Sequence, residues 1–247
     1  MLEKDYNKMA RTYDLSHKLP TRKYGEEFTF LKEIGELKNK TLLDLGCGSG
    51  YYSFLLQKLG AKRIVGIDIS DEMIKVANEK AKLLKLENVE FLVEDLSKFK
   101  SEEKFDIVIS AFVFNHMKTK EEVLKFCETI YRSLNKDGFY VGCSSNFHHQ
   151  KYSEDFYKNY GIKITIPEYE NGKPVFVKMF VEKEQTIEIT NSFLFPKIYE
   201  EAFKKVGFSS VEWIKTKISP IGIKKYGKEF WENYQEYPYE IFIKAKK

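Results

Sequence analysis

Residues 42–50, Leu-Leu-Asp-Leu-Gly-Cys-Gly-Ser-Gly, decide the fold of this chain. The short apolar run 42–45 is bounded by glycine and predicts a central parallel strand that is covered on both faces. The three alternate glycines allow a sharp turn with positive φ and let a ligand approach the main chain. Residues 51–59 follow at helical spacing and stop at Gly60, so the loop leads to a helix N-terminus with unpaired N–H groups.

The glycine loop does not match two other nucleotide-binding patterns. Tyr51 stands where a dinucleotide dehydrogenase has its third glycine, and no Gly-Lys-Ser/Thr sequence closes the loop as in a P-loop. The next predicted strand, residues 63–68, ends in Asp68 about 20 residues after the first glycine. At that spacing a carboxylate can accept hydrogen bonds from ribose hydroxyls, so we predict a ligand that contains a ribose.

Two further predicted strands bring polar or small residues to the same edge of the sheet. Residues 89–93 are followed by Glu-Asp-Leu at 94–96, and residues 105–109 are followed by Ser-Ala-Phe at 110–112. Because ligands of open α/β sheets bind outside the carboxyl ends of the strands, we expect a ligand crevice at this edge.

Over residues 40–145 this order of strand, glycine loop, helix and acid resembles class I S-adenosylmethionine-dependent methyltransferases. The resemblance implies an α/β, Rossmann-like fold: a seven-stranded, mostly parallel sheet with helices on both faces and an antiparallel last strand. It implies S-adenosyl-L-methionine as cofactor and S-adenosyl-L-homocysteine as product. It places residues 46–48 against the methionine part, Asp68 on the ribose, residues 95–96 at the adenine and residue 110 or 111 near the sulfonium. The implied cofactor-binding residues are Tyr13, Arg22, Asp44, Gly46, Cys47, Gly48, Ser49, Asp68, Ile69, Met73, Asp95, Leu96, Ser110 and Ala111.

We expect a single methyltransferase domain over residues 1–247, with an addition at each of two places. Residues 1–24 are polar and aromatic without clean periodicity, and the family resemblance implies a cofactor lid that contains Tyr13; packing on the sheet edge is the alternative. Residues 147–195 interrupt the alternation of strands and helices, and they predict an antiparallel hairpin over 175–181 and 186–195. We interpret this insertion after the fifth strand as a substrate cap.

The remaining elements follow from apolar periodicity and from start and stop signals. The predicted helices cover residues 26–37, 70–84, 119–134, 196–206 and 220–237, and the predicted strands cover 139–143, 210–214 and 239–245.

Methyl transfer from a sulfonium requires alignment of acceptor, carbon and sulfur and exclusion of water, but little covalent machinery. His116 follows the fourth strand by a few residues and is the candidate catalytic base, with Asn115 beside it to orient the acceptor. The alternative is that His116 caps the next helix. The candidate substrate contacts are Tyr24, His148 and Tyr160.

Composition excludes several function classes. Forty-one basic and 37 acidic residues are spread along the chain and give a formal charge of +4, so no nucleic-acid partner is expected. Three cysteines without Cys-x-x-Cys spacing argue against a disulfide framework and a zinc site, and adjacent histidines at 148 and 149 lack metal-ligand spacing. No apolar run approaches membrane-helix length. We expect a cytoplasmic monomer or homodimer with no metal and no membrane partner.

Three scattered patches indicate a closer resemblance, to the toxoflavin-biosynthesis type of small-molecule methyltransferase: residues 19–24, 157–161 and 219–231. It implies methyl transfer to an N, O or S atom of a small, planar heterocyclic metabolite. Other functions stay open: a non-catalytic S-adenosylmethionine-binding module, a dinucleotide reductase, or a methyltransferase that acts on nucleic acid or protein.

Overall fold

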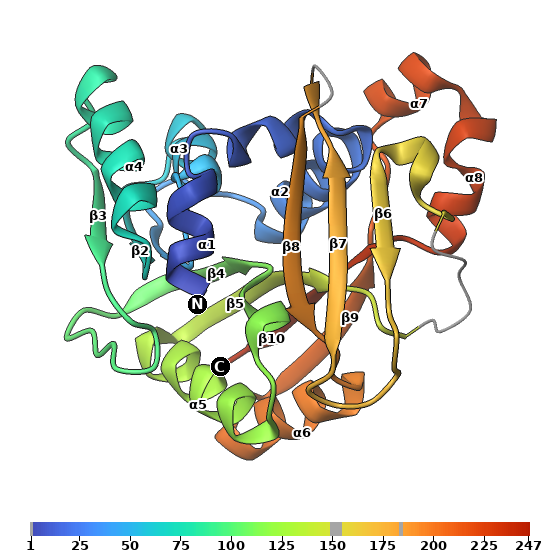
Figure 1. Cartoon of the computed structure of the whole chain (residues 1–247). Coiled ribbons are helices and arrows are strands. Elements are labelled where there is room, and N and C mark those ends of the chain that lie inside the picture. Colours follow the sequence, from blue (N-terminus) through green and yellow to red (C-terminus); the bar gives the residue numbers. More distant parts are fainter. Residues whose placement is uncertain (1, 149–154, 183–184) are drawn as a thin grey trace.

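A computed structural model describes residues 2–148, 155–182 and 185–247. Its centre is a seven-stranded sheet in the order β3-β2-β1-β4-β5-β10-β9 (Figure 1). Strand β10 is antiparallel to both of its neighbours, β5 and β9, and all other neighbouring pairs are parallel. The predicted fold class, including the antiparallel last strand, is therefore confirmed. The strands of this sheet are β1 (Thr41–Leu45), β2 (Arg63–Asp68), β3 (Val89–Val93), β4 (Phe105–Ala111), β5 (Leu134–Ser145), β9 (Ser210–Lys215) and β10 (Glu240–Lys246).

Helices cover both faces of the sheet because side chains of successive strand residues point to opposite sides. Leu42 packs with Phe30 and Leu56 on one face, whereas Leu43 packs with Ile130 and Phe203 on the other. The first face carries α2 (Glu27–Ile34), α3 (Tyr51–Lys58) and α4 (Asp71–Leu83), and the second carries α5 (Lys120–Ser133) and α6 (Pro196–Val206).

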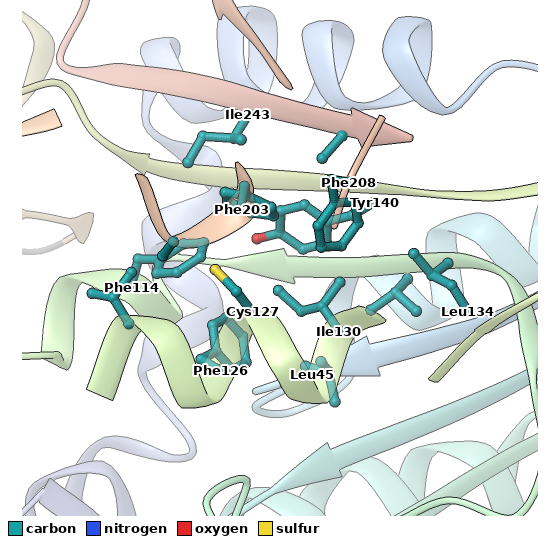
Figure 2. Packing of buried hydrophobic residues seen from close by; sticks show 14 of the residues in the cluster. Leu45, Phe114, Phe126, Cys127, Ile130, Leu134, Tyr140, Phe203, Phe208 and Ile243 are labelled. Atoms are coloured by element: carbon teal, nitrogen blue, oxygen red, sulfur yellow. The ribbon is translucent and has the colours of Figure 1, made fainter. Parts of the chain in front are cut away.

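The core between the sheet and α5 and α6 is aromatic. Figure 2 shows Tyr140 of β5 and Phe203 of α6 side by side above Ile130 of α5. Tyr140 is fully buried, and its hydroxyl group shares a 2.7 Å hydrogen bond with that of Ser110. Burial of each such side chain contributes roughly 1.5–3 kcal/mol, so this packing holds the strand ends in place.

The insertion between β5 and α6 forms a second sheet, which we call the cap sheet. It consists of β6 (Ile162–Thr165), β7 (Pro174–Phe180) and β8 (Thr186–Ser192), all antiparallel, in the order β6-β7-β8. The predicted hairpin is confirmed as β7 and β8. Strand β6 was not predicted, because four residues with two isoleucines are too short a pattern to identify.

The cap sheet rests on aromatic residues from the C-terminal part of the chain. Inward-facing Val177 and Met179 of β7 belong to one buried cluster with Trp231 and Tyr234. The predicted helix over residues 220–237 is two helices, α7 (Pro220–Tyr226) and α8 (Lys228–Glu236), because Gly227 between them has φ +86° and interrupts the helical path.

The N-terminal segment consists of helical pieces: α1 (Leu2–Met9), the 3₁₀ turn η1 (Tyr13–Lys18) and the π turn η2 (Arg22–Glu26). Two further 3₁₀ turns are η3 (Val113–His116) and η4 (Lys158–Tyr160). Two element boundaries differ clearly from the prediction. The helix predicted over residues 26–37 ends at Ile34. The strand predicted over residues 139–143 is the longer β5, which begins at Leu134 directly after α5 and has an irregular register against β4.

Within the described ranges, no helix combines the length and the apolar character needed to cross a bilayer.

Candidate active site

A cavity of about 440 Å³ lies at the carboxyl ends of β1, β2 and β4. This is the edge at which the sequence predicts a ligand crevice, and the volume falls in the range of small-molecule sites. Its walls come from the glycine loop, the tips of the neighbouring strands, the N-terminal segment and η3.

The glycine loop presents bare backbone to this cavity. Gly46, Gly48 and Gly50 have φ values of +73°, +53° and +81°, a region that residues with a Cβ rarely adopt. At Gly48 an added Cβ would meet nothing closer than the Met73 sulfur at 3.9 Å, so the space beside it is open. At Gly46 an added Cβ would lie 2.3 Å from Val113 Cγ2. Gly46 therefore serves packing, whereas Gly48 leaves room for a ligand.

Asp68 lies at the tip of β2 and lines the cavity. Its Oδ2 accepts a hydrogen bond from the Gly48 N–H at 2.8 Å, and its Oδ1 accepts one from the Ser70 N–H at 2.9 Å. A carboxylate has about four acceptor positions, so these backbone contacts leave acceptor capacity for a ligand hydroxyl group. Burial raises the pKa of Asp68 above its usual range.

Asp44 of β1 lies beneath the loop and is buried. Its Oδ2 accepts a 2.7 Å hydrogen bond from Ser53 Oγ of α3, which ties the strand to the helix that follows. Burial raises the pKa of Asp44 to about 7.

The N-terminal segment lies over the cavity and is held there by polar contacts. Ser49 Oγ of the glycine loop donates to Asp14 Oδ1, and Asn7 Nδ2 donates to Asp71 Oδ1 at 2.8 Å. Tyr6 hydrogen-bonds to His116 Nε2 at 3.0 Å. These contacts connect the segment to the loop, to α4 and to η3.

Arg22 is buried where this segment meets β4. Its Nε and Nη2 donate to the two oxygens of Glu26 at 3.0 and 3.2 Å, and its Nη1 donates to Ser16. The guanidinium lies 5.5 Å from the ring centre of Tyr13 and 5.4 Å from that of Phe112. Arg22 is thereby fixed between two aromatic rings, with its charge met by one carboxylate.

The structure brings the predicted cofactor residues together, with one exception. Ser110 does not line the cavity: its hydroxyl group points into the core toward Tyr140. The predicted residues that do line it are Tyr13, Arg22, Asp44, Gly46, Cys47, Gly48, Ser49, Asp68, Ile69, Met73, Asp95, Leu96 and Ala111.

The two candidate catalytic residues lie in different surroundings. His116 lines the large cavity, and burial lowers its pKa to about 4, so the imidazole is neutral at neutral pH. It does not cap α5, because Thr119 and Glu122 form a capping box there. Asn115 is fully buried and is held by hydrogen bonds to Ser144 and Ser145.

The three candidate substrate contacts lie outside this site. Tyr24 accepts a hydrogen bond from Lys225 at 3.2 Å, and Tyr160 donates one to the Phe230 carbonyl at 2.8 Å within the aromatic cluster under the cap sheet. The exposed His148 packs edge-on against Trp213. None of the three lines the large cavity.

Sequence reasoning missed several aromatic residues of the site. Tyr6, His17, Tyr51 and Phe112 line the cavity, and the His17 and Tyr51 rings stack with centres 3.5 Å apart. Residues 6 and 17 belong to a segment without periodicity, which gave no signal for single positions. Phe112 has φ +61°, a strained conformation for a residue with a Cβ that often marks a functional site.

A second, smaller cavity of about 20 Å³ adjoins the first and faces the cap sheet. Tyr6, Tyr13, Arg22 and Phe112 line both cavities, so they form the boundary between them. The far wall comes from β6, β7 and β8, and Asn115 and Tyr239 contribute to it from the side of the main sheet.

Comparison with known proteins agrees with this arrangement. A family model described as "Methyltransferase domain" matches residues 36–204, more than half of the chain. A demethylmenaquinone methyltransferase of Lactococcus lactis is 28% identical over 220 residues, which cover 85% of this chain and 82% of that protein. A malonyl-[acyl-carrier protein] O-methyltransferase of Bacillus cereus is 30% identical over 156 residues, which cover 62% of this chain and 55% of that protein.

A solved structure with the same fold is described as a putative S-adenosylmethionine-dependent methyltransferase from Listeria monocytogenes. It superimposes with a TM-score of 0.62 at 19% identity, covering 90% of this chain and 96% of that chain. The predicted enzyme class and cofactor are thus confirmed at the level of the family. The chain belongs to the methyltransferase domain family.

Proposed function

We propose that this protein transfers the methyl group of S-adenosyl-L-methionine to a small, planar acceptor held between the large cavity and the cap sheet. The observation that carries this proposal is the pair of adjoining cavities with a shared boundary of Tyr6, Tyr13, Arg22 and Phe112. One cavity has the bare glycine backbone and the acidic strand tip that suit a nucleoside with an amino-acid tail. The other is closed by side chains from an insertion that the cofactor site itself does not need.

The residues of the large cavity fit the cofactor. The open space beside Gly48 admits the methionine part close to the backbone, and the remaining acceptor capacity of Asp68 suits a ribose hydroxyl group. Asp95, Leu96 and Met73 also line the cavity, and we assign them to the adenine. The bound cofactor supplies a methyl group on a positively charged sulfonium. Arg22 and Tyr13 close the cavity and exclude water from that group.

His116 is the proposed general base. The residue lines the cavity, and its imidazole is neutral at neutral pH; with a pKa of about 4 it is a weak base. Its Nε2 contacts the Tyr6 hydroxyl group, which places a second polar group beside the path to the acceptor. Asn115 holds the wall of the smaller cavity through Ser144 and Ser145, so we assign it a positioning role.

A small, planar acceptor is favoured by the walls of the smaller cavity. Aromatic rings of Tyr6, Tyr13, Phe112 and Tyr239 supply flat apolar surfaces, and the cap sheet covers the space from outside. The planar shape also agrees with the resemblance to toxoflavin-type methyltransferases. The two curated relatives are named for different acceptors, a demethylmenaquinone and a malonyl group on acyl-carrier protein, so the acceptor assignment depends on this chain's own cavity.

The proposal is tested with isotopically labelled S-adenosylmethionine and a cell extract separated into small molecules, proteins and nucleic acids. We expect label in the small-molecule fraction and none with the Gly48→Val variant. Label only in protein or nucleic acid would contradict a small acceptor. Binding of S-adenosylhomocysteine without any labelled product would instead support a non-catalytic binding module.

A further inference from the structure

The inner face of strand β8 carries one polar residue among apolar ones. Alternate positions of a strand share a face, so Ile187, Ile189 and Asn191 form one row. In the register with β7 they lie opposite Met179, Val177 and Val175 respectively. Ile189, Asn191, Val177 and Met179 all line the smaller cavity. Asn191 is therefore a carboxamide set in an otherwise apolar wall.

The Asn191 side chain is open to the smaller cavity. The residue is only 5% exposed, and no side-chain hydrogen bond to it is found in the parts of the chain that the structure describes. Its amide atoms are not among the described polar atoms that are fully enclosed without a partner, which are those of Thr21, Tyr199 and Glu240, so they remain accessible from the cavity. By contrast, the Asn115 carboxamide across the cavity is bonded at both its oxygen and its nitrogen. An amide that faces a cavity without a protein partner can complete its hydrogen bonds with a ligand in that cavity.

The charge balance of the smaller cavity restricts that ligand. Among its described lining residues, Arg22 is the one side chain that is charged at neutral pH, and the two hydrogen bonds to Glu26 neutralise it. None of the described residues that line this cavity carries a carboxylate. An acceptor with a net charge would therefore be desolvated here without a counter-charge, which is strongly unfavourable.

The chemistry of a carboxamide restricts the ligand further. Asn191 presents a C=O acceptor and an N–H donor side by side, and the matching edge has an N–H and a C=O side by side. The Tyr239 hydroxyl group accepts from Ser145 Oγ at 3.3 Å and has its own proton left to donate. Tyr239 also lines the smaller cavity, on the side of the main sheet.

We propose that Asn191 is the residue that selects the methyl acceptor, and that the acceptor is a neutral molecule with adjacent N–H and C=O groups, as in a lactam. This inference depends on the proposed methyltransferase function and names the acceptor class of the same site. The cavity of about 20 Å³ has room for about one water molecule. The acceptor must therefore displace a boundary residue on entry.

The test uses the full chain saturated with S-adenosylhomocysteine and three probes of similar size, 2-pyridone, benzoate and benzylamine. Binding is measured by saturation-transfer NMR titration. We expect 2-pyridone to bind at least tenfold more tightly than either charged probe. Asn191→Leu should weaken 2-pyridone binding at least tenfold while the Kd of S-adenosylhomocysteine changes by less than twofold.

Two further variants complete the test. Asn191→Asp keeps the size of the side chain but removes the N–H donor, and it should also lose 2-pyridone binding. Thr190→Val, on the opposite, exposed face of β8, should retain it. No binding of 2-pyridone, equal binding of benzoate, or unchanged binding in both Asn191 variants would overturn the inference. If the wild-type protein does not bind S-adenosylhomocysteine, the proposed function fails as well.

Discussion

The two halves of the candidate active site are built in different ways. The cofactor half consists of backbone and strand tips: Gly48 in the loop after β1 and Asp68 at the end of the neighbouring parallel strand β2 are joined by a 2.8 Å hydrogen bond. The acceptor half consists of side chains on the cap sheet, where Asn191 faces the cavity only because β7 and β8 pair in one register. The cofactor site is therefore fixed by local sequence, whereas the acceptor site depends on long-range strand pairing.

Gly48→Val is expected to have the largest effect on cofactor binding. A branched side chain would fill the open space beside the loop and would strain a backbone with φ +53°. We expect calorimetric titration to show loss of S-adenosylhomocysteine binding by at least about 100-fold. Gly60→Val is the matched control, because Gly60 also has positive φ but lies in open space outside the cavity. Retained binding by Gly48→Val would refute the role of the loop.

His116→Ala separates chemistry from binding. Loss of a general base typically lowers turnover by about 100-fold or more, and we expect the low end because burial lowers the pKa of His116 to about 4. The affinity for S-adenosylhomocysteine should stay unchanged. Tyr6→Phe, which removes only the hydroxyl group bonded to His116, should have a smaller effect. Unchanged turnover at saturating cofactor would contradict base catalysis by His116. The protein would then act only by positioning the acceptor and the cofactor.

Asp68→Ala tests the ribose contact. We expect cofactor binding to weaken by about 1–3 kcal/mol, because hydrogen bonds to a charged group are lost. The exposed Asp137, at the opposite end of the sheet from the strand tips, provides the control variant Asp137→Ala. Wild-type affinity in Asp68→Ala would contradict the assigned contact.

Asp44→Asn tests how the buried carboxyl group beneath the glycine loop contributes to the pH dependence of stability. Burial raises the pKa of Asp44 to about 7, so the folded state holds this proton more tightly than the unfolded state does. Its contribution to stability is therefore present below about pH 4 and is lost as the pH rises to 7. In the wild-type protein, this group should lower the free energy of unfolding by up to about 4 kcal/mol between pH 4 and pH 8. In Asp44→Asn that part of the pH dependence should be absent. Equal pH profiles in denaturant unfolding would contradict this.

The main sheet and the cofactor site were predictable because their signals are local. A glycine loop, an acid at the next strand tip and apolar runs such as 63–68 and 89–93 lie within short windows of sequence, and both strands have the predicted bounds. The helix over 196–206 was equally clear, because it begins at proline and ends before Gly207.

The acceptor side was not predictable, because its residues meet only through tertiary structure. Tyr24 and Tyr160 looked like substrate contacts but pack against the C-terminal helices instead. Asn191 was not singled out, since one asparagine in a strand carries no local signal. A related reason applies to the pair 110 and 111: the strand tip was identified, but the sequence does not show that Ala111 faces the cavity whereas the Ser110 hydroxyl group faces Tyr140.

The most direct test of the central claim is a calorimetric titration of the full chain with S-adenosylhomocysteine, with NADH titrated in parallel. The claim is that the glycine loop and Asp68 hold an amino-acid-bearing nucleoside. It predicts saturable binding of one S-adenosylhomocysteine per chain and no heat with NADH. Binding of NADH, or no binding of S-adenosylhomocysteine, would contradict it.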